Sequence, residues 1–128
     1  PGLQHLRDVV IPSDAQRGYF KGLDGRLVVC QSEHLMLAGY LQAGEKIIMS
    51  LANQLWRTDL RTKGFDHLVR QLNFVHDEWQ TQVSGDRSMA ELVGRIQSDC
   101  ITRAGEILGL KCPMSGSFNI GKNWCETH

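Results

Sequence analysis

The segment from Leu72 to Val83 constrains the fold most, because two runs of β-prone residues flank a short polar segment. The first run ends at Val75, and in the second run apolar and polar residues alternate. A strand, a tight polar turn and a second strand form the pattern of a β-hairpin. The sequence therefore predicts an antiparallel hairpin over residues 72–83.

The turn of this hairpin would carry His76, Asp77 and Glu78, which are three ionisable residues. Adjacent carboxylates on a rigid support are the hard oxygen ligands that divalent cations prefer. Acidic residues at a hairpin tip are also common as solvated turn residues, since Asp is a turn former. The three residues alone leave both interpretations open.

Composition is that of an ordinary globular domain. The 128 residues are 41% hydrophobic and 22% charged, which is enough to bury a core. Lys plus Arg (14) balance Asp plus Glu (14), so there is no global basic signature of nucleic-acid binding. No apolar run approaches membrane-spanning length, and we expect no membrane association.

The cysteines Cys30, Cys100, Cys112 and Cys125 lack Cys-x-x-Cys spacing and a matching pair of histidines, which argues against a zinc site. Without a secretory signal they are expected to be reduced thiols of a cytoplasmic protein. The chain begins with Pro rather than Met, so we expect a cut or processed piece of a longer protein.

Residues 1–17 show no pattern that predicts an element. The segment from Tyr19 to Val29 is clearer, because two β-prone runs flank Gly22-Leu23-Asp24-Gly25. An Asp-Gly pair supplies the positive φ that a hairpin turn needs. A second, shorter hairpin is therefore predicted here.

Ser32 resembles the N-cap of a long helix over residues 33–63 that Gly64 closes. Gly39 and Gly44 lie inside this helix, which indicates a close neighbour, either another helix or a ligand. The predicted apolar stripe consists of Leu37, Leu41, Ile48, Leu51, Ala52 and Leu55.

Ser88 to Glu91 fits a capping box that opens a second helix, which would end at Gly109. The tail from Leu110 to His128 predicts one strand and a closing turn. The whole chain is predicted to be a single α+β unit in which long helices back antiparallel hairpins. The second helix's predicted apolar stripe is Leu92, Ile96, Ile101 and Ile107.

Four motifs occur in order along the chain: Lys21 to Arg26, residues 34–44, Val75-His76-Asp77-Glu78, and Gly121-Lys122-Asn123-Trp124 with His128. Together they resemble the family A DNA polymerases, and their phage branch in particular. Val75-His76-Asp77-Glu78 resembles the last catalytic motif, at the tip of a palm-domain hairpin. Lys21 to Arg26 is similar to the hairpin that precedes the primer–template helix, and residues 34–44 look like that helix. Gly121-Lys122-Asn123-Trp124 and the terminal His128 resemble the closing motif.

The resemblance implies that Asp77 is a ligand of two catalytic Mg²⁺ ions and that Glu78 is a supporting carboxylate. His76 would approach the 3′ end of the primer. Two metal ions held by carboxylates suit phosphoryl transfer to a 3′-hydroxyl, which depends on positioning and charge neutralisation. We therefore expect the Mg²⁺ site to be completed by residues outside this chain.

The resemblance also implies contacts to DNA. Gln42 and His34 would lie in the minor groove, where acceptor atoms are common to all base pairs. Arg26 would contact a backbone phosphate. The family usually places an Asn four residues before the glutamine, and here that residue is Ala38, so one contact is absent.

As a whole, the resemblance implies the C-terminal part of the palm of a DNA-directed DNA polymerase, acting in DNA replication in a host cytoplasm. Residues 1–17 would be a remnant of the junction between fingers and palm. The expected partners are primer–template DNA, dNTP and a missing N-terminal half that carries the second catalytic Asp and the nucleotide-binding helix. The isolated chain is expected to be inactive.

Two other functions remain open. One is a nucleic-acid-binding or interaction module that keeps the palm scaffold without catalysis. The other is a metal-dependent hydrolase using His76, Asp77 and Glu78, which is weaker because the sequence shows no second ligand cluster.

Overall fold

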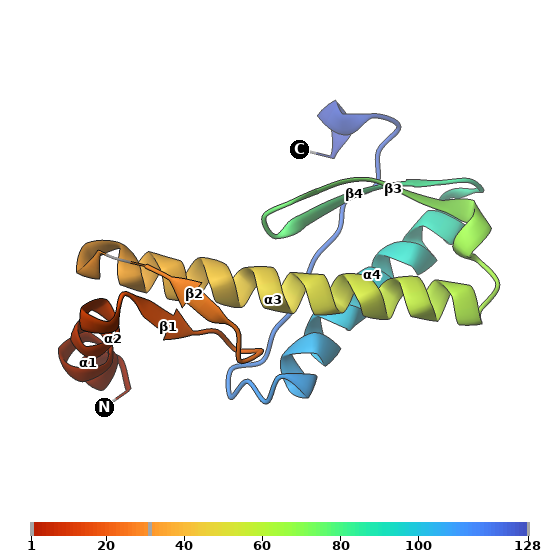
Figure 1. Ribbon diagram of the computed structural model, residues 1–128. Helices are drawn as coiled ribbons and strands as arrows, with labels where there is room; N and C mark the ends of the chain where they lie inside the picture. Colours follow the sequence, from red (N-terminus) through yellow and green to blue (C-terminus); the bar gives the residue numbers. More distant parts are fainter. Residues whose placement is uncertain (1, 31, 128) are drawn as a thin grey trace. The chain divides into compact units, whose positions relative to one another are not determined.

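The computed structural model describes residues 2–30 and 32–127, which form the α+β fold that the sequence predicts. The chain divides into two compact units, Pro1–Ile47 and Ile48–His128, and each has its own hydrophobic core. Helix α3 (Glu33–Thr62) supplies residues to both units (Figure 1). The assignment to a polymerase palm stays a prediction at this level.

The N-terminal unit begins with helical structure that the sequence did not indicate. Helix α1 (Gly2–His5), the π-helical turn η1 (Leu6–Val10) and helix α2 (Ile11–Arg17) follow one another without a break. Buried Asp14 accepts hydrogen bonds from the Tyr40 hydroxyl and the Arg17 guanidinium. Contacts between distant residues therefore support these turns, and local periodicity does not reveal them.

The hairpin predicted between Tyr19 and Val29 is confirmed. Strands β1 (Tyr19–Lys21) and β2 (Leu27–Val29) pair antiparallel, and Gly25 has a φ of 85° in the loop between them. Phe20 is 1% exposed. A Cβ at Gly39 would lie 3.3 Å from Phe20 Cε1, so the neighbour of this helical glycine is an aromatic ring of the hairpin.

Helix α3 begins at the predicted residue and ends one residue before the predicted Lys63, and Gly64 beyond it has a φ of 73°. The predicted stripe is right in its second half, where Ile48 and Ala52 are buried, and wrong in its first half. Leu37 and Leu41 are 44% and 67% exposed. The buried face of that half instead includes Met36, Tyr40, Ala43 and Ile47, because the hairpin and α2 pack there.

The hairpin predicted over residues 72–83 is also confirmed. Strand β3 (Val69–Val75) follows the short helix η2 (Asp66–Leu68) and pairs antiparallel with β4 (Glu78–Val83). The register shifts between Gln71 and Asn73, which leaves Leu72 as an extra residue in a β-bulge.

Helix α4 (Arg87–Ile107) begins two residues earlier than predicted, and its N-cap is Asp86 rather than Ser88. The Asp86 carboxylate accepts a hydrogen bond from Met89 N at 3.0 Å, and Ser88 Oγ donates to the same carboxylate at 2.7 Å. The helix ends as predicted, with Gly109 at a φ of 69°.

The predicted stripe of α4 is right for Ile96 and Ile101, which pack against the core, and wrong at its two ends. Leu92 and Ile107 are 38% and 62% exposed, whereas Val93, Cys100 and Ala104 lie in the core. The C-terminal tail passes close to a neighbouring face of the helix, where two glycines leave room for it. A Cβ at Gly94 would lie 2.4 Å from Phe118 Cδ2, and one at Gly105 would lie 2.7 Å from Met114 Cγ.

The predicted strand in the tail is absent, since residues 110–123 form neither strand nor helix before the short helix η3 (Trp124–Glu126). The tail instead binds side chains of α4. Ser98 Oγ donates to Gly116 O at 2.5 Å, and Thr102 Oγ1 donates to Met114 O at 2.8 Å. Hydroxyl groups of α4 therefore bind carbonyl groups of the tail, and the tail does not form the strand that the sequence pattern predicts.

Replacing Gly94 by Ala tests this packing. The new methyl would meet the Phe118 ring, and overpacking of this kind lowers the free energy of unfolding by about 1–3 kcal/mol. In a Phe118→Ala background the same change should be neutral or stabilising, because Ala favours a helix over Gly by up to about 1 kcal/mol. Urea unfolding of the four variants measures the coupling, and additive effects would show that the tail does not pack on Gly94.

The N-cap of α4 gives a prediction on acid stability. Hydrogen bonds from Ser88 and from Met89 N lower the pKa of the Asp86 carboxyl. A lowered folded-state pKa means that the contribution is present above about pH 4 and is lost as the pH falls through the folded value. Asp86→Ala should therefore lower the Tm at pH 7 more than at pH 3.

Asp86→Asn should keep the cap without the pH dependence, since Asn caps helices about as well as Asp. Ser88→Ala should have the smaller effect at pH 7. A larger decrease in Tm for Ser88→Ala than for Asp86→Ala would show that Ser88 is the N-cap.

Candidate active site

The tip of the β3–β4 hairpin is a two-residue loop. Val75 pairs with Glu78, which leaves His76 and Asp77 between the strands. His76 has a φ of 52°, in the left-handed region that is uncommon outside glycine but enriched in His. Two-residue hairpin loops need such a residue, so His76 performs the backbone role usually given to Asn or Gly.

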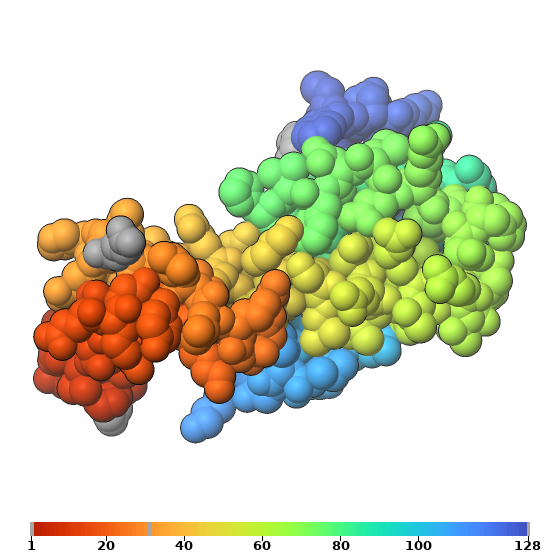
Figure 2. Space-filling view, in the orientation of Figure 1, coloured from red at the N-terminus to blue at the C-terminus, as the bar shows by residue number. Residues whose placement is uncertain are grey.

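The two tip carboxylates have different surroundings. Asp77 is exposed and forms no ion pair with any residue of the two described ranges. Glu78 is half-buried and accepts a hydrogen bond from Gln80 Nε2, two residues along the same face of β4. The segment from 69 to 83, in green, reaches the surface in Figure 2. The prediction that His76 and Asp77 lie in an exposed turn is confirmed, whereas Glu78, also predicted in the turn, is the first residue of β4.

Aromatic side chains behind the loop hold the hairpin in place. The Trp79 ring centroid lies 5.9 Å from that of Phe74 on the neighbouring strand and 6.1 Å from that of Trp56 on α3. Trp79 and Val83 pack against the core of the C-terminal unit, as the alternation along β4 predicts. The loop is therefore carried on a short hairpin that is anchored to a helix.

The donor set of the tip fits part of a magnesium site. Carboxylate oxygens are the ligands that Mg²⁺ prefers, and the ion usually takes one or two of them together with water and substrate phosphates. Within residues 2–30 and 32–127, no group of three or more His, Cys, Asp or Glu could hold a metal ion. Asp77 and Glu78 could thus contribute ligands, and their metal-binding role stays a prediction.

The other predicted site residues belong to the N-terminal unit. His34 and Gln42 are both exposed on α3, and their eight-residue separation places them on the same side of the helix, with exposed Ala38 between them. Arg26 lies in the loop between β1 and β2, where its guanidinium binds the Asp24 carboxylate.

The cysteines offer no nucleophile at this site. All four are free thiols, as the sequence predicts. Burial, followed by the nearby Asp59 carboxylate, raises the pKa of Cys100 to about 12. The Asp59 carboxylate accepts hydrogen bonds from Arg103 Nη1 at 2.5 Å and from Cys100 Sγ at 3.7 Å, which joins α3 to α4. Cys100 is therefore a core residue.

The sequence analysis missed a groove beside β3 with arginines on its wall. Its lining includes Arg57 and Arg61 of α3 and runs along β3 as far as Phe74. The signal that could have found it is the spacing of the two arginines, because residues four apart share one face of a helix.

No protein-family model matches the chain. None of the helices in the described part of the chain has the length and apolar character needed to cross a membrane.

Two phage proteins resemble the chain along most of its length. It is 27% identical over 121 residues to the DNA-directed DNA polymerase of Escherichia phage Phieco32, in an alignment that covers 89% of this chain and 19% of the polymerase. It is 28% identical over 117 residues to the DNA-directed DNA polymerase of Enterobacteria phage T3, covering 88% of this chain and 16% of the polymerase. The chain thus spans less than a fifth of each relative, and it is similar to a segment of a phage DNA polymerase.

Proposed function

We propose that this chain is the C-terminal palm segment of a phage-type family A DNA-directed DNA polymerase and that Asp77 acts in nucleotidyl transfer. One observation carries the proposal. An exposed carboxylate stands on a braced two-residue hairpin tip, in a chain whose similarity to two phage DNA polymerases extends over almost nine-tenths of its length.

The tip residues would divide the chemistry between them. Asp77 would hold the catalytic Mg²⁺, and Glu78, oriented by its hydrogen bond from Gln80, would add negative charge beside it. When bound, two Mg²⁺ ions supply charge neutralisation at the attacking and leaving oxygens of the phosphoryl group. The hairpin would hold the carboxylates in place before the substrate arrives. A catalytic site requires its groups to be held in the productive geometry in this way.

Residues on both units would contact primer–template DNA. His76 would meet the 3′ end of the primer, while Gln42 and His34 would donate or accept hydrogen bonds in the minor groove. Arg26 is the weakest of these contacts, because its guanidinium already binds Asp24 and a phosphate would have to compete with that carboxylate.

The dNTP and the rest of the catalytic centre would come with further polypeptide. The polymerases that resemble this chain are more than five times as long as the segment they share with it. A second Asp and a nucleotide-binding helix from an N-terminal half would complete the site in the host cytoplasm. The competing function is a non-catalytic nucleic-acid-binding module on the same scaffold, and primer extension with that half distinguishes the two.

The decisive prediction concerns Asp77. This chain alone should not extend a primer, and the chain mixed with, or fused to, the polypeptide encoded upstream of it should do so in Mg²⁺. Asp77→Ala and Asp77→Asn in the complete enzyme should reduce kcat by at least about 10²-fold, the scale on which loss of one charge-stabilising group acts. A steady-state primer-extension assay measures these rates.

Glu106→Gln is the matched control, because it removes one exposed carboxylate from the same unit away from the hairpin. It should leave the rate unchanged. Primer extension by the chain alone would contradict the proposal that a second polypeptide completes the active site. Full activity of both Asp77 variants would show that Asp77 is not part of that site. A complete enzyme that binds DNA but never extends a primer would support the non-catalytic module.

A further inference from the structure

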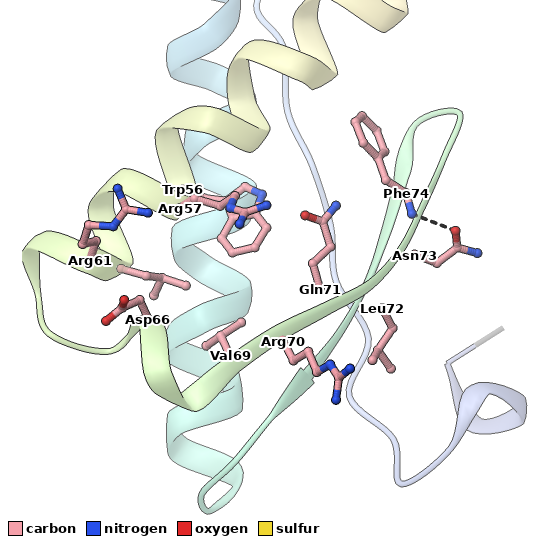
Figure 3. A pocket seen from close by; sticks show the side chains of 11 residues that line it. Trp56, Arg57, Arg61, Asp66, Val69, Arg70, Gln71, Leu72, Asn73 and Phe74 are labelled. Atoms are coloured by element: carbon pink, nitrogen blue, oxygen red, sulfur yellow. Dashed lines mark hydrogen bonds between the residues drawn. The ribbon is translucent and has the colours of Figure 1, made fainter.

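The groove beside β3 is a second candidate site, in the C-terminal unit. It has a volume of about 500 Å³ and lies between α3 and the strand, lined by residues 56, 57, 60 and 61 of the helix and by residues 66 and 69–74 (Figure 3). Trp56 and Leu60 are 3% and 1% exposed and form its apolar floor. No part of this lining belongs to the loop at the hairpin tip.

The walls of the groove carry excess positive charge. Arg57 and Arg61 are exposed, and within the described residues neither forms an ion pair. Asp66 is the one carboxylate in the lining. Figure 3 shows Arg57 and Gln71 reaching into the space between α3 and β3, while Arg70 leaves the strand on the other side and adds charge only at the margin.

We propose that this groove binds the phosphodiester backbone of single-stranded DNA. Arg57 and Arg61 are four residues apart, which places them one helical turn, about 6 Å, from each other along one face of α3. Two guanidinium forks in a row suit two successive phosphates, since the planar fork matches phosphate geometry. A volume of this size is typical of small-molecule sites and admits one strand rather than a duplex.

The choice of DNA over an acidic peptide rests on the proposed function, because an arginine pair alone would suit either. A positively charged groove that follows a backbone is the usual feature of proteins that bind single strands without sequence preference. The chain's zero net charge does not oppose this, since binding depends on the local charge. The Gln71 amide offers an additional donor to the strand.

Fluorescence anisotropy with a labelled dT12 oligonucleotide tests the proposal on the full chain. The double variant Arg57→Ala/Arg61→Ala should weaken binding at low salt at least about fivefold. Two lost phosphate contacts should also reduce the slope of log K against log salt by about 1.4, at roughly 0.7 per contact on a single strand. Circular dichroism should show an unchanged fold, since both side chains are exposed.

The matched control is Arg95→Ala/Lys111→Ala, which removes two exposed positive charges elsewhere in the same unit. It should bind dT12 within twofold of the unsubstituted chain. Equal losses in the two double variants, or no binding of dT12 at all, would overturn the proposal. So would displacement of dT12 by dTTP, inorganic phosphate or a poly-glutamate peptide at equal phosphate or carboxylate concentration.

This test is separate from that of the polymerase function, because it measures binding and requires no catalysis. An enzyme that extends primers while the arginine variant binds dT12 normally would contradict the groove alone. Loss of dT12 binding in an assembly that never extends a primer would contradict the polymerase alone.

Discussion

Packing of Trp79 between Phe74 and Trp56 sets the geometry of the C-terminal unit. The Phe74–Trp79 pair fixes the register of β3 on β4, and Trp56 fixes that pair to α3. A slip of one residue would turn Trp79 from the core to solvent, because side chains alternate along a strand. Only this register leaves His76 and Asp77 unpaired. The exposed carboxylate at the tip is therefore a consequence of where the aromatic residues must be buried.

The same unit depends on close approach between α4 and an irregular tail. Gly94 and Gly105 leave room for Phe118 and Met114, and hydroxyl groups of α4 satisfy carbonyls of the tail. The closing Gly121–Glu126 segment is held in a related way. Lys122 N and Asn123 Nδ2 both donate to the Glu126 carboxylate, at 2.8 and 3.0 Å. In this segment, Gly and Asn thus have a structural role whatever function the tail serves.

The sequence predicted the features that depend on local chemistry. Glycines at 25, 64 and 109 take positive φ, and they marked one hairpin loop and two helix ends correctly. The sequence predictions failed where contacts with residues distant in the chain decide which face of a helix is buried. Leu41 fits a helical stripe, but Phe20 packs on a different face of α3, and the tail covers small residues of α4 instead of the larger Leu92. The tip was recognised from its residue types, whereas the arginine groove exists only once β3 lies beside α3.

A neutral chain can carry an anionic tip and a cationic groove because distance separates them. Six residues lie between Arg70, at the margin of the groove, and Asp77 along β3 and its loop, which corresponds to roughly 20 Å of extended chain. This is about twice the Debye length near 0.1 M salt, so exposed charges at the two ends influence each other little. The tip can attract cations while the far end of the groove attracts phosphate. Net charge averages the two, which is why composition gave no sign of either.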